Sequence, residues 1–459
     1  MKRHTYVALL ATLLSATAWG QEVSLYGTTM AQMWKAETPG FDKATYTPAT
    51  QWLGIDATKL GSDNLSLHLF GWGRTDLSES TNFDGTKSGG YLNYGYLQYD
   101  FKQANAEIKA GRFTANQSTG FEQIDGVSAR TDLRGGFTVS AFAGKPVLYR
   151  TVDPVTQTDY NFQRDFIVGT RIGLRVPKLG EIGISYLQDG SKAAKDLTIP
   201  SSVDYTRKQV GADILIAPTA SFDFHGRTVF DMASHVDAAP GVDRSRIAEH
   251  DYTATVRIGS QVAVSANYAE RNFFAFFAGT NLPSLFRQDD HDKFKGEGLS
   301  VTWNTPWGIQ AIADVRHTER QTYGTTTRTG GELRWANAEK TAQVGAGGHF
   351  TNAAKALLVD ATAPSRSLTN AEARAWGMVT KGKLSASLDA IVQKFKADNP
   401  YLAGLKTVHE VIASVGFQAS KNFKVSGDIS HGSTPAAKNE TRGLLRADYR
   451  FGFGKKGGQ

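Results

Sequence analysis

The C-terminal stretch Leu445-Arg446-Ala447-Asp448-Tyr449-Arg450-Phe451-Gly452-Phe453 alternates apolar or aromatic residues with charged residues or glycine. Successive side chains of a β-strand point to opposite faces, so the apolar residues share one face and the charges share the other. The same period of two recurs along almost the whole chain, and the connections between the runs are alternately short and long. Strands of this kind, with lipid on one face and water on the other, are typical of a transmembrane β-barrel.

Several hairpins support this prediction. The alternating run 166–176 ends at Pro177-Lys178-Leu179-Gly180, and the apolar residues of 182–186 return the chain. Similar short turns are expected at 217–219, 259–261, 304–307 and 419–422. Longer polar segments lie between the hairpins, at 35–47, 76–89, 147–163, 189–203, 234–246, 271–292, 352–369, 395–406 and 431–440.

The predicted fold is therefore an all-β, antiparallel, up-and-down transmembrane barrel of about 22 strands, with a range of roughly 18 to 24. Its short turns are expected to be periplasmic and its long loops extracellular. A soluble sandwich or propeller is the alternative fold. The regular alternation of loop lengths and the aromatic residues near strand ends favour the barrel.

The N-terminal residues have the features of a secretory signal peptide. A basic stretch, Met1 to His4, precedes an apolar run, and Ala18-Trp19-Gly20 places small residues before Gln21. The apolar run is too short for a helix that spans ~30 Å of hydrocarbon. We expect a signal peptide at 1–20, the barrel at 21–453 and a short periplasmic tail at 454–459. Because the first predicted strand begins at Val23, no plug domain is expected.

The composition limits the chemistry of the chain. It contains no cysteine, which excludes disulfides, thiolate metal sites and covalently attached c-type haem on this chain. The net charge of +7 agrees either with a lumen that favours anions or with ordinary charge on solvated loops. No basic patch on a recognisable nucleic-acid-binding motif is present, so we expect no nucleic-acid partner.

Charged residues at inward positions of the predicted strands are candidates for lining the pore. Such charges create a field across a channel and tune its ion selectivity. Alternatively, opposite charges on neighbouring strands pair with each other and have only structural roles. The candidates are Arg171, Arg175, Arg227, Arg257, Arg316, Lys424, Arg446, Arg450, Asp213, Asp223, Asp314, Asp428 and Asp448.

The long connection 271–292 contains five phenylalanines, Phe273, Phe274, Phe276, Phe277 and Phe286. Large apolar side chains gathered in one connection are unfavourable in water. We expect them to form a constriction at the mouth of the barrel or to contact a partner; otherwise the strand extends and they join an outer aromatic girdle. If it is not fully strand, the segment 114–136 is a second candidate for a constricting loop.

The sequence shows no catalytic constellation, and we predict neither an enzyme nor a bound cofactor. The densest group of possible metal ligands is Asp289-Asp290-His291-Asp292. Its carboxylates are suitable for a hard cation, but its spacing matches no known binding loop and no glycine organises a turn. A solvated loop is the simpler interpretation, so no metal site is predicted.

The final strand and the signal peptide resemble those of Gram-negative porins. The resemblance implies that Tyr449, Phe451 and Phe453 form the signal read by the barrel-assembly machinery, although porins typically end on the terminal Phe and here a tail follows Phe453. The segments 90–101, 108–113, 126–130 and 141–146 are similar to porin-like proteins of metal-reducing deltaproteobacteria. Some members of that group form porin–cytochrome conduits, in which the barrel sheathes a multihaem cytochrome, and others are thought to admit small oxyanions.

Two functions remain open. The first is a channel in the Gram-negative outer membrane for small hydrophilic solutes, including anions, with both termini periplasmic. The second is the barrel sheath of a trans-outer-membrane electron-transfer conduit, with multihaem c-type cytochromes as partners. A barrel of about 22 strands without a plug has a wide lumen that something must restrict, and a cytochrome or inward-folded loops would do so. Outer-membrane lipid and the barrel-assembly machinery are expected partners in both cases. The sequence allows a homo-oligomer but identifies no face through which copies of the chain would associate.

Overall fold

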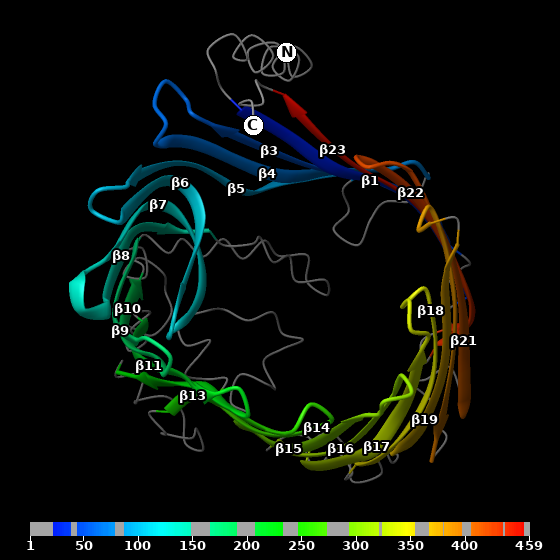
Figure 1. Ribbon diagram of the computed structural model, residues 1–459. Helices are drawn as coiled ribbons and strands as arrows, with labels where there is room; N and C mark the ends of the chain where they lie inside the picture. Colours follow the sequence, from blue (N-terminus) through cyan, green and yellow to red (C-terminus); the bar gives the residue numbers. More distant parts are fainter. Residues whose placement is uncertain are drawn as a thin grey trace, which may run out of the picture.

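The structure is a computed structural model that describes residues 22–37, 44–78, 87–147, 166–190, 207–232, 247–272, 293–320, 324–353, 367–379, 381–396, 405–434 and 437–453. The strands of these residues form one antiparallel sheet that closes into a barrel (Figure 1). Closure is made by the first and last strands, which pair from Val23–Phe453 to Glu37–Asn439. Among the described residues, no helix is long and apolar enough to cross a membrane.

The strands follow one another around the barrel in chain order. Their bounds are β1 Glu22–Glu37, β2 Ala44–Tyr46, β3 Pro48–Thr58, β4 Leu65–Asp76, β5 Ser88–Phe101, β6 Ala106–Gln117, β7 Gly120–Asp132, β8 Phe137–Pro146, β9 Phe166–Val176, β10 Gly180–Gly190, β11 Arg207–Thr219, β12 Phe222–Asp231, β13 Ile247–Ile258, β14 Val262–Asn272, β15 Lys293–Asn304, β16 Ile309–Arg320, β17 Gly324–Ala336, β18 Ala342–Ala353, β19 Leu368–Val379, β20 Leu384–Phe395, β21 Thr407–Ser420, β22 Phe423–Thr434 and β23 Ala437–Phe453. A single 3-10 turn, η2 Arg134–Gly136, lies between β7 and β8 in the described chain.

The short strand β2 does not add to the circumference of the barrel. Both β2 and β3 pair with β1, so they are two parts of one strand that is interrupted at Thr47. The described residues therefore form a closed barrel of 22 strands, which confirms the predicted fold. Closure leaves no strand edge, as the hydrocarbon of a membrane requires, because lipid offers no hydrogen-bond partners.

The connections at the two ends of the barrel differ in length. At one end, short turns such as 177–179, 259–261 and 421–422 lie where the sequence predicted them. Most connections at the other end are longer, but the described strands β6 and β7 are joined there by only two residues.

Two loop boundaries were predicted wrongly. The segment 431–440 is not a long loop, because β22 continues to Thr434 and β23 begins at Ala437. Similarly, β1 extends to Glu37, beyond the predicted start of a loop at 35. Strands that project beyond the hydrocarbon have water on both faces, so their polar residues do not mark where the strand ends.

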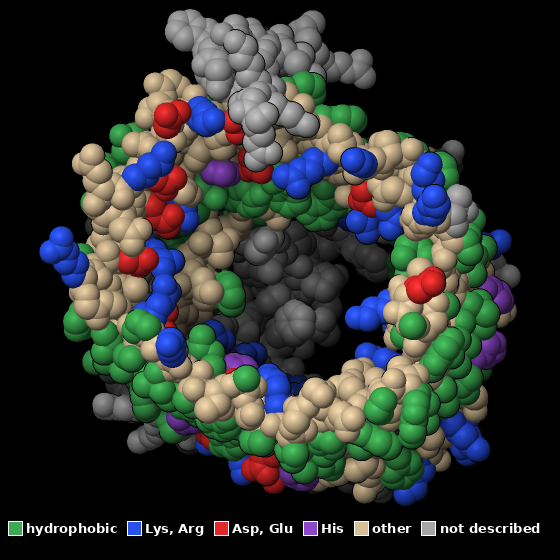
Figure 2. Space-filling model, viewed as in Figure 1, with side chains coloured by type: hydrophobic (Ala, Val, Ile, Leu, Met, Phe, Trp, Pro, Cys, Tyr) green, Lys and Arg blue, Asp and Glu red, His purple; other side chains and the backbone are tan. Residues whose placement is uncertain are grey.

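The outer face of the barrel is apolar. Cross-strand partners share a face, and the outward partners Ile172 and Ile184 are 59% and 65% exposed. Val415, Ile429 and Leu445 are outward and more than half exposed as well. Figure 2 shows hydrophobic side chains along the outer wall. Exposure of this much apolar surface is favourable only against lipid.

Several predictions fall outside the described residues. These are the signal peptide at 1–20, the tail at 454–459, the phenylalanines at 273–286 and the acidic group at 289–292. They stay predictions.

Candidate functional site

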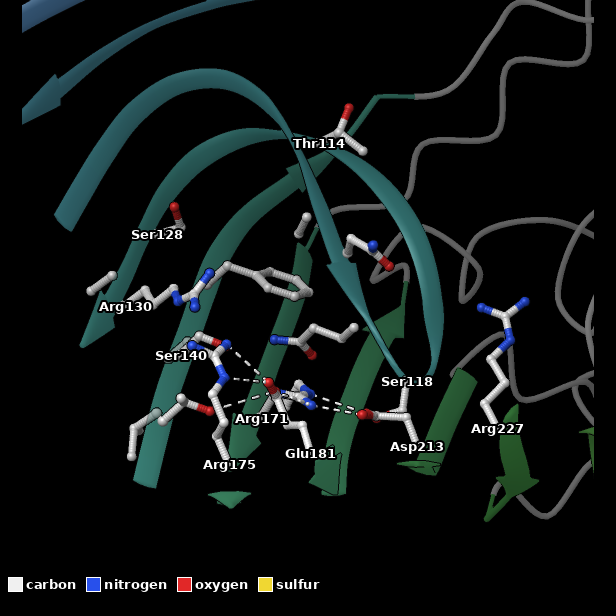
Figure 3. Close-up of a pocket in the computed structure, with 18 of the residues that line it drawn as sticks. Thr114, Ser118, Ser128, Arg130, Ser140, Arg171, Arg175, Glu181, Asp213 and Arg227 are labelled. Atoms are coloured by element: carbon white, nitrogen blue, oxygen red, sulfur yellow. Dashed lines mark hydrogen bonds and ion pairs between the residues drawn. The ribbon is translucent and has the colours of Figure 1, made fainter. Parts of the chain in front are cut away.

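The β6–β7 hairpin leaves the wall and enters the lumen (Figure 1). β6 pairs with β5 only as far as Arg112, and β7 pairs with β8 only from Ile124 onwards. Between these points, residues 114–122 continue as a two-stranded ribbon in which β6 pairs with β7. We call residues 114–122 the inner ribbon. Figure 3 shows its strands arching away from the wall towards Ser118 at the tip.

Glycines permit the bend at the base of the inner ribbon. Gly111 and Gly126 are direct cross-strand partners. Gly111 has φ = 126°, a backbone conformation that residues with a Cβ rarely adopt. A Cβ at Gly126 would lie 2.1 Å from the carbonyl oxygen of Ala143. The two glycines therefore let the hairpin backbone approach its neighbours closely where it turns inward.

Apolar side chains hold the base of the inner ribbon against the wall. Phe113 and Ile124, at the start of the bend, pack with Phe142 of β8, Ile167 of β9 and Leu187 of β10. Each of the five is at most 6% exposed. Burial of side chains of this size is worth about 1.5–3 kcal/mol each. All five lie on the inner face of the sheet, so this cluster anchors the ribbon on the side that faces the lumen.

The tip of the inner ribbon is bound to the middle of β10 and β11. The backbone N–H of Ser118 donates to Oγ of Ser185 at 3.0 Å, and the Ser118 hydroxyl donates to Asp213. A Cβ at Gly211 would lie 2.8 Å from that of Ser118, so the tip rests directly on this glycine. Arg171 donates to both carboxylate oxygens of Asp213, at 3.0 and 2.6 Å.

A chain of ion pairs continues from the tip along the wall (Figure 3). Arg171 also contacts Glu181 at 2.9 Å, and Glu181 contacts Arg175 at 2.9 Å. Together with Arg130 and Arg227, these side chains line a cavity of about 700 Å³ beside the ribbon. The space around the inner ribbon is therefore polar and charged, as expected for a water-filled pore.

A buried ion pair ties the second strand of the inner ribbon to the wall. Arg207 of β11, which is 4% exposed, contacts Glu122 of the ribbon. It also contacts Asp189 of β10 at 2.8 Å, and Asp189 is fully buried. One guanidinium thus compensates two carboxylates away from water. Loss of one partner in such a group leaves uncompensated buried charge.

The variant Arg207→Ala is expected to release the inner ribbon. Uncompensated Glu122 and Asp189 would destabilise the docked ribbon by about 3 kcal/mol. Glutamyl endopeptidase should then cut the folded barrel after Glu122 at least about tenfold faster, because local opening exposes the bond. Arg130→Ala is the matched control, since its pair with Asp132 spans 3.5 Å and is half exposed. Equal cleavage of both variants would show that Arg207 does not hold the ribbon.

All the charged residues predicted to line the pore occupy inward positions in the strand register. Ion pairs join most of them, which agrees with the structural interpretation of these charges. The pairs are Arg171–Asp213, Arg175–Glu181, Arg227–Glu249, Arg257–Asp223, Arg446–Asp448 and His349–Asp314. Among the described residues, Arg316, Lys424, Arg450 and Asp428 have no ion-pair partner.

Two of the lumen arginines face each other. Arg316 of β16 and Arg328 of β17 are direct cross-strand partners, both are exposed, and neither forms an ion pair within the described residues. Like charges placed opposite each other repel, and a bound anion would relieve the repulsion. Arg328 was not among the predicted pore-lining residues, because the run Gly324-Thr325-Thr326-Thr327-Arg328 has no apolar face that shows which side chains point inward.

A group of aromatic rings lines the lumen on β1, β3, β4 and β5. We call Tyr26, Trp52, Phe70, Trp72 and Tyr94 the aromatic platform. Ring centroids of adjacent members are 5.5 to 6.2 Å apart from Trp72 through Trp52 and Phe70 to Tyr26 and Tyr94. Figure 2 shows hydrophobic side chains on the inner face of this part of the wall.

The aromatic platform was not predicted from the sequence, because aromatic residues were expected in girdles on the outer face. The signal was present in β4, where Leu65, Leu67 and Leu69 alternate with Ser66 and His68. If the leucines face lipid, then Phe70 and Trp72 occupy the alternate positions of the strand, on the same inner face as Ser66 and His68. The position of the platform is therefore marked in β4 by aromatic residues at inner-face positions, where polar residues are expected.

Asp56, His68 and Ser66 form a hydrogen-bonded chain near the platform. Nδ1 of His68 lies 2.7 Å from Asp56, and its Nε2 lies 3.0 Å from the Ser66 hydroxyl. The order of groups is that of a hydrolase triad. However, Ser66 is only 8% exposed and its backbone lies within the ladder between β3 and β5, so its N–H is not free to stabilise an oxyanion. We therefore assign the hydrogen bonds among Asp56, His68 and Ser66 a structural role rather than a catalytic one. Among the described residues, no group of three or more metal-ligating side chains occurs.

Comparisons with known proteins support the fold. No protein-family model matches the chain, and no curated protein matches it. The siderophore receptor PirA from Pseudomonas aeruginosa is similar in structure, with a TM-score of 0.56 and 11% identity over 94% of this chain and 80% of that chain. The P pilus usher PapC translocation pore has a TM-score of 0.50 and 10% identity over 93% of this chain and 99% of that chain.

A ferric enterobactin receptor mutant (PfeA) from Pseudomonas aeruginosa is also similar, with a TM-score of 0.56 and 10% identity over 93% of this chain and 81% of that chain. The chain has the fold of an outer-membrane β-barrel. Identities this low show the fold alone. The comparisons do not support the narrower likeness to conduit-forming deltaproteobacterial proteins.

Proposed function

We propose that this chain is a porin-like channel of the Gram-negative outer membrane that passes small hydrophilic solutes and favours anions. The inner ribbon carries this proposal. A barrel of 22 strands is wide, because diameter grows with strand number. The ribbon is held in the lumen by the apolar cluster, by Ser118 and by Arg207. A constriction held in place in this way gives a pore a defined width.

The position of the closing strand pair supports the proposed orientation, with both termini periplasmic. Val23 and Phe453 are partners at the end of the barrel that carries the short turns. In outer-membrane barrels the short turns are periplasmic, so both ends of the described chain would lie on that side. Tyr449 and Phe451 are outward and their ring centroids lie 5.8 Å apart. With Phe453, they present an aromatic surface that the barrel-assembly machinery would recognise.

Preference for anions is supported by Arg316 and Arg328. Two guanidinium groups of adjacent strands face the same lumen without a carboxylate between them in the described structure. Charges on a pore wall raise the local concentration of counter-ions and so affect which ions pass. This local pair supports the anion preference better than the net charge of the chain does.

Single-channel recording in planar bilayers tests the proposal. The purified chain should give stable conductance steps, because the inner ribbon is packed on the wall rather than free. Under a gradient of KCl, the reversal potential should have the sign of chloride preference. Absence of steps, or a reversal potential with the sign of potassium preference, would contradict the channel and its anion preference respectively.

The cytochrome sheath is the second candidate, and the wide barrel is the observation that favours it. A sheath would position an electron-conducting partner in the lumen rather than pass solutes. The same recordings separate the two functions. Large, unstable currents that disappear only when a haem protein co-purifies would favour the sheath, whereas small stable steps from the chain alone favour the channel.

A further inference from the structure

We infer that the lumen holds a binding site for aromatic carboxylates of the benzoate class, formed by the aromatic platform together with Lys424 and Arg450. This inference rests on the proposed channel function, since it names a class of solute that the channel would take up. The binding itself is a property of the wall and is testable without conduction.

The aromatic platform is built to lie flat on the wall. Gly54 is the direct cross-strand partner of Tyr26, and a Cβ at Gly54 would lie 2.3 Å from the Tyr26 ring. The absence of that Cβ lets the ring lie across β3. The Tyr26 and Tyr94 hydroxyls then hydrogen-bond each other at 2.8 Å over β4. Phe70, beneath them, has its ring plane within 17° of Tyr26 and 24° of Tyr94.

The platform offers mainly ring surface to the lumen, and its polar groups are two tyrosine hydroxyls and the indole N–H groups of Trp52 and Trp72. All five rings are half-buried, so each keeps part of its surface in contact with the lumen. The hydroxyls of Tyr26 and Tyr94 are already paired with each other. A sugar would need several polar partners at this surface. A planar apolar body stacks on such rings without them.

Cationic side chains flank the platform on the strands next to it. Arg450 of β23 is the direct cross-strand partner of Tyr26, and Lys424 of β22 lies on the next strand. Neither forms an ion pair with another described residue. Their charge is therefore open to a ligand. Lys424, Arg450, Tyr26, Trp52 and Phe70 line one cavity of about 670 Å³, which lies in the size range of small-molecule sites.

The other charged side chains that line this cavity are Arg446, Asp448 and Lys421, which lies in the turn before β22. Asp448 accepts hydrogen bonds from Arg446 at 2.8 Å and from the Thr28 hydroxyl at 2.6 Å. The only carboxylate that lines the cavity is thus paired, and the cations of the cavity without an ion pair among the described residues are Lys421, Lys424 and Arg450. A ligand that fits both parts of the site has a flat apolar ring and one negative charge, which is the chemistry of benzoate.

Equilibrium binding to the detergent-folded full chain tests the inference, with sodium benzoate as the probe. Saturation-transfer NMR on the benzoate ring protons gives the half-saturating concentration. Acetate supplies the charge without the ring, and benzamide supplies the ring without the charge. Benzoate should bind saturably and at least about tenfold more tightly than benzamide, as a hydrogen-bonded charge requires. Acetate in tenfold excess should not displace it.

Two variants locate the site. Trp52→Leu and Lys424→Gln should each raise the half-saturating concentration about fivefold, through lost stacking and lost charge. Phe294→Leu is the matched control, because Phe294 faces the lumen on β15, opposite Arg320 and away from the platform. It should leave the benzoate affinity unchanged. Heat-modifiable migration on gels shows which variants are folded, and Lys424→Gln keeps the test valid if Trp52→Leu does not fold.

The outcomes separate the site from the channel. Benzoate that binds no better than acetate, or whose affinity is the same in both variants as in the parent, overturns the inference. A chain that conducts ions but does not bind benzoate overturns the site and leaves the channel. A chain that binds benzoate through Trp52 and Lys424 but gives no conductance steps supports the site and contradicts the channel.

Discussion

Replacement of the inner ribbon beyond Thr114, residues 115–122, by an Asn-Gly turn should raise the single-channel conductance at least about twofold, because conductance follows the open cross-section of a pore. Asn-Gly closes a two-residue hairpin with the twist of the flanking strands, so the cross-strand partners Thr114 and Gln123 would remain paired. The wall strands are untouched by this change. Single-channel recordings before and after the replacement measure the effect. Unchanged conductance would mean that the ribbon does not limit the current.

A point variant tests the same idea without a deletion. Gly211→Val places a side chain where a Cβ already meets the ribbon at 2.8 Å, so the tip should be displaced from β11. Conductance should rise, or become noisy as the ribbon moves. Gly89→Val is the matched control, since a Cβ at Gly89 meets nothing within 4 Å. An equal effect of both variants would assign the change to the barrel as a whole.

Charge reversal of the facing arginines should change the ion selectivity. In the double variant Arg316→Glu and Arg328→Glu, two carboxylates replace two guanidinium groups at one level of the lumen. The ratio of chloride to potassium permeability should fall at least about threefold, because the wall then attracts cations. Reversal potentials under a KCl gradient measure this ratio. A larger effect is expected at low salt, where screening is weaker.

The control for this prediction changes net charge to the same extent outside the lumen. Lys102→Glu and Lys383→Glu lie in exposed short turns and together replace two cations by two carboxylates. They should leave the permeability ratio close to that of the parent chain. If this control shifts the ratio as much as the arginine variant does, overall charge rather than the lumen pair sets the selectivity.

The barrel was predictable from the sequence because the pattern that indicates it lies within each single strand. Lipid and water on opposite faces impose a period of two, and residues 166–176 and 445–453 show it without any knowledge of their neighbours. The inward position of charges such as Arg171 follows from the same parity. Strand number follows from counting hairpins, and the described residues form a barrel of 22 strands.

The inner ribbon was not predictable in the same way, because its inward turn depends on contacts with strands that lie elsewhere in the sequence. Residues 114–122 pair as β-strands, and sequence analysis treated 114–136 only as a loop candidate. What turns them inward is the close approach allowed at Gly111 and Gly126, and a surface formed by β8, β9 and β10. Periodicity within a strand contains no information about such contacts.

The contacts of the inner ribbon have a consequence for the order of assembly. All of these contacts lie within residues 113–213, which are one continuous stretch of the chain. None of them involves the closing pair of β1 and β23. Contacts between residues near in sequence form with less loss of chain entropy than the closure of the whole sheet. The ribbon is thus expected to dock while the sheet is still an open curve. In a barrel that closed first, the hairpin would have to fold in through the open mouth to reach β10 and β11.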